Sequence, residues 1–387
     1  MNKAKRILID GRFVGVGDSI SRYTLETLNG ILKLDHDNQY TLLIRPQGEQ
    51  TLERYPDIVN ASNLKVDILE IPHYSLAEQT KLLKYLNKEK YDLVHFTQFN
   101  HPIFYRGNYV TTIHDLTLVG HLHYFNFGKQ LAYNMVMKSA ARDSKKVIAI
   151  SKTSMDDVID FFGTPKSKFE IIYHGIDHIN YNEKVKKELG KIKSFKEKYG
   201  IKGDYILYTG MWKKHKNLIR LFQAFEEFKK ATTNPIQLVL TGKIDKNEPE
   251  VIAEMERINN LAMKQFNSEA ILTTGYIDEE ELPIAYAGAQ ICVIPSLSEG
   301  FGWPPLEAMA CGTPVIASKI SCIPEILGDA PYYFDPYKVD QIEKAISTVL
   351  GDEKVRKDLT EKGLKQVQKY NWAETAKETL EVYKSLI

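Results

Sequence analysis

The chain has 387 residues, of which 43% are hydrophobic and 26% charged, and its formal net charge is +1. This near balance of charge excludes the strong positive field that attracts nucleic acids or anionic membranes. No run of about 18 apolar residues occurs, which excludes a transmembrane helix, and the length predicts two domains. The N-terminus lacks a signal-peptide pattern. Three cysteines without metal-ligand spacing predict buried thiols in a reducing compartment. We therefore expect a cytoplasmic protein, with peripheral contact at the inner face of the membrane left open.

Short apolar segments that alternate with longer helical patterns predict parallel β-strands. Because these segments are apolar without interruption, we expect helices on both faces of each sheet. In the first half the segments are 6–10, 40–45, 65–71, 92–96, 109–115 and 146–151. In the second half they are 205–210, 236–242, 270–276, 291–296 and 314–318. The predicted fold class is α/β, with two Rossmann-like domains facing each other across a cleft at the carboxyl ends of their strands.

The first strand leads into a glycine-containing loop, GRFVGVGDSISRY (11–23). Gly15 and Gly17 predict a loop whose backbone approaches a ligand closely, although such a turn is a weak signal by itself. His114 ends the strand at 109–115, at the ligand-facing edge. His121 and His123 lack accompanying carboxylates at metal-ligand spacing, so we predict no metal site there.

A helix is predicted within 72–90, where Leu76, Leu82, Leu83 and Leu86 would face inward. Core packing is favoured over membrane binding for this helix. The polar, lysine-rich segment 182–204 predicts a solvated hinge between the domains with one amphipathic helix, which is favoured over a basic membrane-binding patch. The domain boundary is therefore placed at residue 182.

The strand at 205–210 is followed by a basic turn, GMWKKHKN (210–217), and an amphipathic helix. Gly210 permits the turn, Asn217 is the expected helix cap, and Lys216 stands beside that cap. A cationic turn at the beginning of a helix suits a diphosphate. Lys213 and Lys214 are equally well explained as a solvated charge run.

The segment SLSEGFGWPPLEAMACGTPVIAS (296–318) places Glu299 and Glu307 on either side of a glycine turn and two prolines. The prolines suit the first turn of a helix, and Gly312 is expected to end it. A carboxylate can accept two hydroxyl groups, which suits the diol of a ribose or a hexose. Taken alone, Glu307 is explained equally well as a partner of the helix dipole.

These motifs together resemble retaining glycosyltransferases of family 4, and in particular mannosyltransferase-like members. Their fold, called GT-B, has two Rossmann-like domains. The resemblance covers nearly the whole chain and rests on motifs that occur in the family's order. They are TIHDL (112–116), VIAISKTS (147–154), IIYHGID (171–177), the GxxxxxKN element at 210–217, GYIDEEEL (275–282), the E-x7-E element from Glu299 to Glu307, IPEILGD (323–329) and NWAETA (371–376).

The resemblance implies an acceptor-side domain at 1–182, a nucleotide-sugar-binding domain at 183–371 and a final helix at 372–387 that returns to the first domain. Catalytic roles would belong to His114, which touches the sugar or its leaving-group oxygen, and to Glu299, which lies beside the sugar. Glu307 would bind the ribose, and backbone near Tyr276 and Ile277 would receive the base. The remaining donor-binding residues would be Gly15, Gly17, Gly210, Lys216, Gly300, Phe301, Gly302 and Trp303.

The implied activity is metal-independent transfer of a hexose, mannose among the candidates, to a glycan or lipid-linked acceptor. The donor would be GDP-mannose or a UDP- or dTDP-sugar, with no cofactor and no nucleic-acid partner. Polysaccharide biosynthesis is the expected setting. Front-face attack is favoured over a double displacement with Glu299 as nucleophile. The alternatives are a degenerate transferase acting as a scaffold and a nucleotide-sugar epimerase, which would lack the E-x7-E element.

The chain departs from the family pattern at two places. Met211 and His215 stand where many relatives carry an arginine, which removes a fixed cation from the diphosphate. Ser19 or Ser21 stands where many relatives have a glycine, which adds side chains where backbone would approach the ligand. Both departures predict donor binding that is weaker, or differently arranged, than in the typical member.

Overall fold

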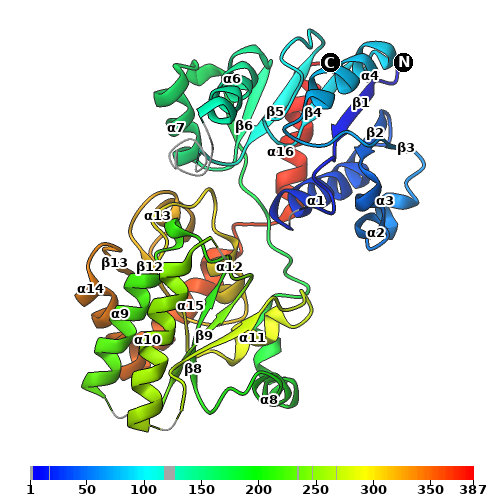
Figure 1. Ribbon diagram of the computed structural model, residues 1–387. Helices are drawn as coiled ribbons and strands as arrows, with labels where there is room; N and C mark the ends of the chain where they lie inside the picture. The colour runs from blue at the N-terminus through cyan, green and yellow to red at the C-terminus, as the bar shows by residue number, and fades with distance from the viewer. Residues whose placement is uncertain (1–2, 17, 117–126, 233–234, 246, 267) are drawn as a thin grey trace. The chain divides into compact units, whose positions relative to one another are not determined.

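The computed structural model describes residues 3–16, 18–116, 127–232, 235–245, 247–266 and 268–387. The chain forms two compact units. Unit 1 comprises Met1–Gly175 and Tyr370–Ile387, and unit 2 comprises Ile176–Lys369. Each unit is built around a parallel sheet of its own, as the alternation of apolar and helical segments predicts (Figure 1).

The sheet of unit 1 has seven strands in the order β3-β2-β1-β4-β5-β6-β7. All neighbouring strands are parallel, and the strand order reverses between β1 and β4, as in a doubly wound Rossmann fold. Strands β4 and β5 are buried at every residue, because neighbouring strands flank them. The strands are β1 (Arg6–Asp10), β2 (Gln39–Ile44), β3 (Leu64–Ile68), β4 (Leu93–Phe96), β5 (Tyr109–Ile113), β6 (Lys146–Ala149) and β7 (Phe169–Ile171).

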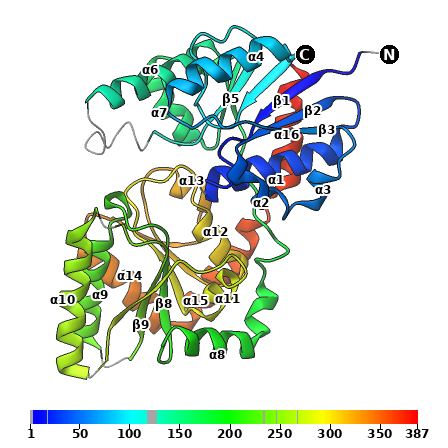
Figure 2. The ribbon, with the colours of Figure 1, turned by 45° about the vertical axis from the view of Figure 1, so that its right-hand side comes forward.

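The helices of unit 1 include one from the far end of the chain. Helix α16 packs along α1, and both views show the two side by side (Figures 1 and 2). Gly30 permits this approach, since a Cβ atom there would lie only 2.4 Å from the Cβ of Ala376. The helices are α1 (Asp18–Leu34), α2 (Glu49–Leu52), α3 (Pro56–Val59), a π-helical turn (Glu78–Leu82) continued by α4 (Leu83–Glu89), α6 (Phe127–Asp143), α7 (Lys152–Phe162) and α16 (Trp372–Lys384).

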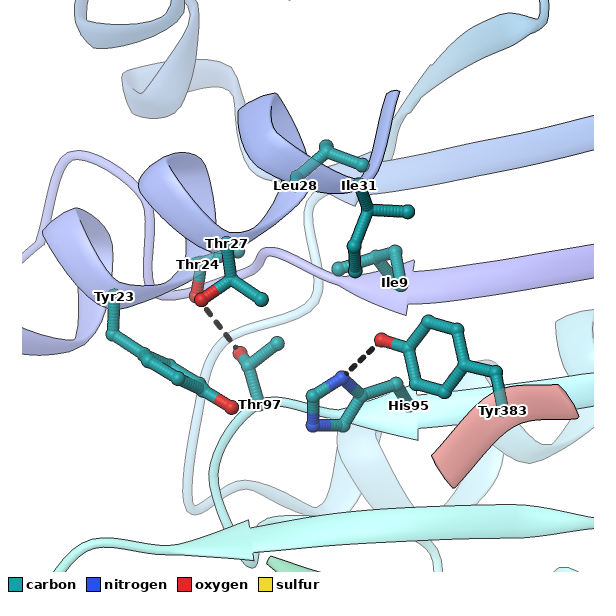
Figure 3. Close-up of a pocket in the computed structure, with 9 residues that line it drawn as sticks. All are labelled: Ile9, Tyr23, Thr24, Thr27, Leu28, Ile31, His95, Thr97 and Tyr383. Carbon is teal, nitrogen blue, oxygen red and sulfur yellow. Dashed lines mark hydrogen bonds between the residues drawn. The ribbon is translucent and has the colours of Figure 1, made fainter. Parts of the chain in front are cut away.

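A buried polar network joins α16 to the sheet of unit 1 (Figure 3). His95 on β4 bonds through Nδ1 to the Tyr383 hydroxyl (2.5 Å) and through Nε2 to the Thr112 hydroxyl (2.8 Å). Burial lowers the pKa of His95 to about 3, with a smaller contribution from His114. The imidazole therefore stays neutral at pH 7. The small pocket between α1 and the strands, which His95 and Tyr383 line, is part of the core of unit 1 (Figure 3).

Unit 2 repeats this design with six parallel strands in the order β10-β9-β8-β11-β12-β13. The order reverses between β8 and β11, so these two strands correspond in position to β1 and β4 of unit 1. The strands are β8 (Tyr205–Thr209), β9 (Gln237–Thr241), β10 (Ile271–Gly275), β11 (Ile291–Ile294), β12 (Val315–Ser318) and β13 (Tyr332–Phe334).

Helices cover the sheet of unit 2, and α9, α10 and α14 pack on one face around a core that contains Trp212 and Phe222. Helix α12 packs against both α11 and α15, and α15 also contacts α14, so that its Leu359 joins the same core. The helices are α8 (Leu189–Lys198), α9 (Leu218–Ala231), α10 (Pro249–Phe266), α11 (Leu282–Gly288), α12 (Trp303–Ala310), α13 (Ile323–Leu327), α14 (Val339–Gly351) and α15 (Glu353–Val367).

Several details differ from the sequence predictions. The units divide after Gly175, not at residue 182, because Tyr181 already belongs to unit 2, where its ring packs near Tyr286 (6.2 Å). The three-residue strands β7 and β13 were not predicted. Leu76 does not face inward: the residue is 83% exposed, whereas Leu82 and Leu86 are buried. All three cysteines are free and buried, as expected.

Candidate functional site

The loops after β8 and β11 meet at the point where the strand order of unit 2 reverses. Parallel α/β sheets bind ligands at such a switch point, beyond the carboxyl ends of the strands. Glycines line this edge: the Gly210 N–H donates to Thr241 (3.1 Å), and the Gly242 N–H donates to Gly275 (2.8 Å). A Cβ at Gly242 would lie 2.3 Å from the Gly210 carbonyl oxygen. The backbones therefore pack closely here because the residues lack side chains.

Lys216 and Glu299 form an ion pair across this switch point. Lys216 ends the 3₁₀ turn Lys214–Lys216 after β8, and Glu299 lies in the loop after β11. The Lys216 Nζ is 2.7 Å from Glu299 Oε1, and each side chain is 17% exposed. The structure thus brings together two residues that are 83 positions apart in the chain.

Glu299 is held from both its side chain and its backbone. The Ser296 hydroxyl donates to Oε1 (2.6 Å), and the Ser321 hydroxyl and Cys322 thiol donate to the Glu299 carbonyl oxygen (3.0 and 3.1 Å). Burial favours a raised pKa for the Glu299 carboxyl, but the charge and hydrogen bond of Lys216 and the Ser296 bond lower the pKa overall. Glu299 is therefore a carboxylate at neutral pH, with both of these donors on Oε1. Among the residues that the structure describes, none donates to Oε2.

Asn217 does not cap α9 as its position suggested. Its backbone is left-handed (φ 60°) and not in the extended conformation of a capping residue, and its side chain makes no capping bond. The side-chain amide instead donates to the carbonyl oxygens of Pro295 (3.0 Å) and Pro336 (2.8 Å). Asn217 therefore ties the basic turn to the end of β11, which positions Lys216 beside Glu299.

Glu307 lies one helical turn into α12, behind the turn that contains Glu299. Only 3% of it is exposed, and its Oε2 accepts from the Tyr286 hydroxyl (3.1 Å). Helix α12 ends as expected: Gly312 adopts a φ of 74°, its N–H donates to Met309, and the Thr313 N–H donates to Ala308. This pair of bonds is a Schellman motif.

The other predicted donor-binding residues of unit 2 lie at the same edge of the sheet. Tyr276 follows β10 with an exposed ring, whereas Ile277 is buried. The remaining four form the turn that leads into α12, where Gly302 has a φ of 90° and the rings of Phe301 and Trp303 lie 6.3 Å apart. Pro304 and Pro305 have no N–H, so any backbone donors at this end of α12 come from Gly300, Phe301, Gly302 and Trp303.

His114 lies in unit 1, directly after β5. Its side chain is buried, and Nε2–H donates to the Thr97 carbonyl oxygen (2.9 Å). Burial lowers the pKa of His114, although the Thr97 bond and Asp115 act in the opposite direction. The ring is therefore neutral at pH 7, with the proton on Nε2 and an acceptor lone pair on Nδ1.

The glycine loop of unit 1 is described in part. Gly15 has a φ of 78°, and a Cβ there would lie 2.4 Å from the Gln47 carbonyl oxygen, so only glycine fits. Its N–H donates to the Ser21 hydroxyl (3.4 Å). Gly17, His121 and His123 lie outside the described residues.

Metal-binding clusters and membrane-spanning helices are both absent from the described part of the chain. Among residues 3–116, 127–232 and 235–387, apart from the undescribed positions 17, 246 and 267, there is no group of three or more His, Cys, Asp or Glu side chains that could hold a metal ion. Within the same residues, no helix is long and apolar enough to cross a membrane.

Sequence reasoning missed residues that support the site. Ser296 and Lys216 both donate to Oε1 of Glu299. The Ser296 contact could have been predicted, because Ser296 stands only three residues before Glu299 in the same loop. Tyr286 and Ser321 carried no such signal, because they come from α11 and from the loop after β12.

Comparisons with known proteins agree with this architecture. The family model for glycosyl transferases group 1 matches residues 191–366, and the model for glycosyltransferase family 4 matches residues 20–179. The chain is 25% identical to the O-antigen chain mannosyltransferase B of Escherichia coli, over 95% of this chain and 96% of that protein. It is 30% identical to the serotype-specific mannosyltransferase WbdA of Escherichia coli over 62% of this chain, but this match covers only 29% of WbdA.

The solved structures show the same fold. The Anabaena protein HepE, in complex with UDP and glucose, superposes with a TM-score of 0.75 at 18% identity, over 98% of this chain and 100% of that one. The predicted GT-B fold is thereby confirmed. With family models matched in both units and a relative aligned along nearly its whole length, the chain belongs to the family 4 glycosyltransferases, and its relatives include mannosyltransferases.

Proposed function

We propose that this glycosyltransferase is a retaining, metal-independent mannosyltransferase that uses GDP-mannose and extends a glycan, free or lipid-linked. The names of its relatives support mannose as the sugar and a polysaccharide as the product. The observation that carries the donor site is the Lys216–Glu299 pair at the switch point of unit 2.

In the proposal, Lys216 binds the diphosphate of the donor. An ammonium group has three N–H donors, and the contact with Glu299 uses one of them. Two donors can then reach phosphate oxygens without breaking the ion pair. Met211 and His215 supply no permanent cation beside it, so Lys216 carries more of the phosphate charge than it would with an arginine nearby.

Glu299 and Glu307 are proposed to bind the hydroxyl groups of the donor. Oε2 of Glu299 is the open acceptor of a carboxylate whose other oxygen is already bonded, which suits a hydroxyl of mannose. Glu307 is proposed to accept from the ribose, with the base near Tyr276 and Ile277. Because Glu307 is nearly buried, the ribose must come against the start of α12.

His114 is proposed to bind the transferred sugar as an acceptor. Its only N–H is used by Thr97, so the neutral ring offers the Nδ1 lone pair and no proton. This chemistry suits a sugar hydroxyl, which can donate, and does not suit a leaving-group oxygen that gains negative charge. Of the two roles that the family resemblance implies, we therefore propose the first.

The proposed chemistry is front-face attack. The bond between the anomeric carbon and the phosphate oxygen breaks while the acceptor oxygen bonds to that carbon on the same face. The acceptor proton passes to the departing phosphate. Lys216 and the backbone N–H groups before α12 stabilise the charge on the leaving group. The ion pair with Lys216 lowers the nucleophilicity of Glu299, which disfavours a double displacement.

The test is a panel of GDP-mannose, UDP-glucose and dTDP-glucose with α-mannotriose as acceptor, followed by NMR of the anomeric proton in the product. We expect transfer from GDP-mannose with retained α configuration, unchanged by EDTA. Activity that EDTA abolishes and manganese restores would contradict metal independence. Nucleotide-sugar binding without transfer or slow hydrolysis would support the scaffold alternative instead.

A further inference from the structure

Tyr74, in the loop after β3 of unit 1, combines an unusual backbone with an exposed ring. Its φ is 53°, a left-handed conformation that bulky residues rarely adopt, and 56% of the residue is exposed. Neither feature stabilises the fold. A glycine would adopt this backbone conformation without strain, and an exposed aromatic ring contributes little burial free energy. Strained residues of this kind are concentrated at ligand sites, where the surrounding structure holds them in place.

A buried ion triad holds this loop. The Glu78 carboxylate lies near the Tyr74 backbone, whose N–H acts to lower the pKa of Glu78, and Glu78 pairs with Arg12 (3.1 Å). Arg12 in turn pairs with Asp10 (2.7 Å) and donates to the Asn100 carbonyl oxygen (3.3 Å). The three charged side chains are almost wholly buried. The conformation of Tyr74 is therefore anchored in the interior of unit 1 and is not a property of a free loop.

Two further rings support the Tyr74 ring from behind. Tyr133 lies parallel to it (6.1 Å between centroids, 19° between planes), and Phe99 lies 6.2 Å away. Both are buried and contact each other at 4.7 Å. The result is an aromatic platform, defined here as Tyr74, Phe99 and Tyr133, in which the Phe99 ring is inclined by 49° to Tyr74 and by 65° to Tyr133.

The platform lies at the ligand-facing edge of the sheet of unit 1. Phe99 is in the loop after β4, beside the point where the strand order reverses. Phe99 and Tyr133 pack in one buried cluster with Ile113, the last residue of β5, which directly precedes His114. The platform therefore lies near the end of β5 that carries His114.

Unsatisfied polar groups lie beside the platform. The amide of Asn100, which is 1% exposed, and both ring nitrogens of His73 are buried and have no hydrogen-bond partner among the described residues. Asn100 follows Phe99 in the chain, and His73 precedes Tyr74. Buried polar groups are normally satisfied by protein, water or ligand. This part of unit 1 thus combines an aromatic surface with hydrogen-bonding capacity, a combination typical of small-molecule sites.

We propose that the platform of Tyr74, Phe99 and Tyr133 is the subsite for the acceptor glycan, in which a pyranose ring stacks on the exposed face of Tyr74. This rests on the proposed function, since it takes the acceptor to be a glycan. The C–H groups of one pyranose face carry partial positive charge, which complements the negative face of an aromatic ring. The sugar hydroxyls are then left to hydrogen-bond with neighbouring polar groups.

The test is a titration of α-mannotriose followed by ligand-observed NMR, with the full-length protein and three variants. Tyr74→Gly removes the ring and suits the positive φ, so its folding is preserved. Tyr74→Phe keeps the ring. Phe161→Ala is the matched control, because Phe161 is equally exposed (54%) but lies near the carboxyl end of α7, at the opposite edge of the sheet.

We expect Tyr74→Gly to weaken binding of α-mannotriose at least tenfold, and Tyr74→Phe and Phe161→Ala to leave it within about twofold. Tyr74→Gly that binds like the wild type would overturn the inference, as would a wild type that does not bind α-mannotriose. Hydrolysis of GDP-mannose separates this inference from the proposed function. A wild type that cleaves the donor but ignores the trisaccharide defeats the inference alone. A protein that binds the trisaccharide through Tyr74 but cleaves no nucleotide sugar defeats the proposed function alone.

Discussion

The two units place an ion network at equivalent positions and use it differently. Arg12 follows β1 in unit 1 as Lys216 follows β8 in unit 2, and both strands border a switch point. In unit 1, burial raises the pKa of Glu78 in spite of Arg12. In unit 2, burial also favours a raised pKa for Glu299, but Lys216 and the Ser296 hydrogen bond together lower it overall. The first network is enclosed by protein and supports a loop, whereas the second remains partly open to solvent and keeps charge available for a ligand.

The largest expected effect is on the stability of unit 1. Arg12→Met leaves two buried carboxylates without their cation, and removing one partner of a buried ion pair costs about 3–5 kcal/mol. Chemical denaturation, with hydrogen exchange to identify the unit that unfolds, measures the change. Arg6→Met is the surface control, because Arg6 pairs with Glu89 near solvent. If Arg12→Met lowers the free energy of unfolding no more than Arg6→Met does, the triad does not stabilise unit 1.

Lys216→Met should affect activity much more than stability, in contrast to Arg12→Met. The pair of Lys216 with Glu299 lies between the exposed and the fully buried case, with both side chains 17% exposed, so its loss should cost about 1–3 kcal/mol of stability. Transfer activity should fall about 10²–10³-fold, as expected when one stabilising donor to the leaving group is lost. Steady-state kinetics with GDP-mannose and the denaturation curve of the same preparation check both numbers. If Lys216→Met keeps normal activity, or loses as much stability as Arg12→Met, the Lys216–Glu299 pair does not serve the ligand in the way proposed.

Substitution of Glu307 tests whether a nearly buried carboxylate still binds the nucleotide. Glu307→Ala should weaken nucleotide binding by about 1.5–3 kcal/mol, the usual value of a hydrogen bond to a charged group. Calorimetry with GDP measures it. Tyr286→Phe is the control, because it removes the hydroxyl that donates to Glu307 and leaves the carboxylate. Unchanged affinity in Glu307→Ala would mean that the residue serves only the packing of α12 against α11.

Sequence reasoning predicted the features that depend on local pattern. Each of the eleven apolar segments overlaps one observed strand. Strands buried on both faces need apolar runs, whereas the edge strands β3 and β10 are only partly buried. The positions of Lys216 and Glu299 at one sheet edge followed from the same rule, since residues after parallel strands share an edge. Their direct pairing was not predicted, because it depends on how Asn217 turns the basic loop.

Features that depend on contacts between residues far apart in the chain could not be predicted from the sequence. Glu78 is 66 residues from Arg12, and nothing in the sequence indicates that they pair. The positive φ of Tyr74 is equally hidden, because turns of that kind are expected at Gly, Asn or Asp. The same limit applies to the domain boundary, which depends on the packing of Tyr181 near Tyr286.

The two units should also differ in how they respond to acid. Burial is the largest cause of lowered histidine pKa values in unit 1, to about 4 for His73 and His101 and to about 3 for His95. A histidine with a lowered folded pKa binds fewer protons in the folded state than in the unfolded state. Its contribution to stability is therefore complete above pH 6.5 and is lost as the pH falls toward the folded pKa. The lowered pKa of Glu299 acts only below its ordinary value of 4.5.

Between pH 6.5 and 5, unit 1 should therefore lose stability at up to about 1.4 kcal/mol per pH unit for each such histidine, while Glu299 contributes no change. Amide exchange at several pH values, corrected for intrinsic rates, should show β4 and β5 losing protection before β8 and β11. His95→Gln is the matched variant, and it should reduce the slope for unit 1 by about one histidine's share. Equal acid sensitivity of the two sheets, or a slope unchanged in His95→Gln, would show that the buried histidines do not set the acid response of unit 1.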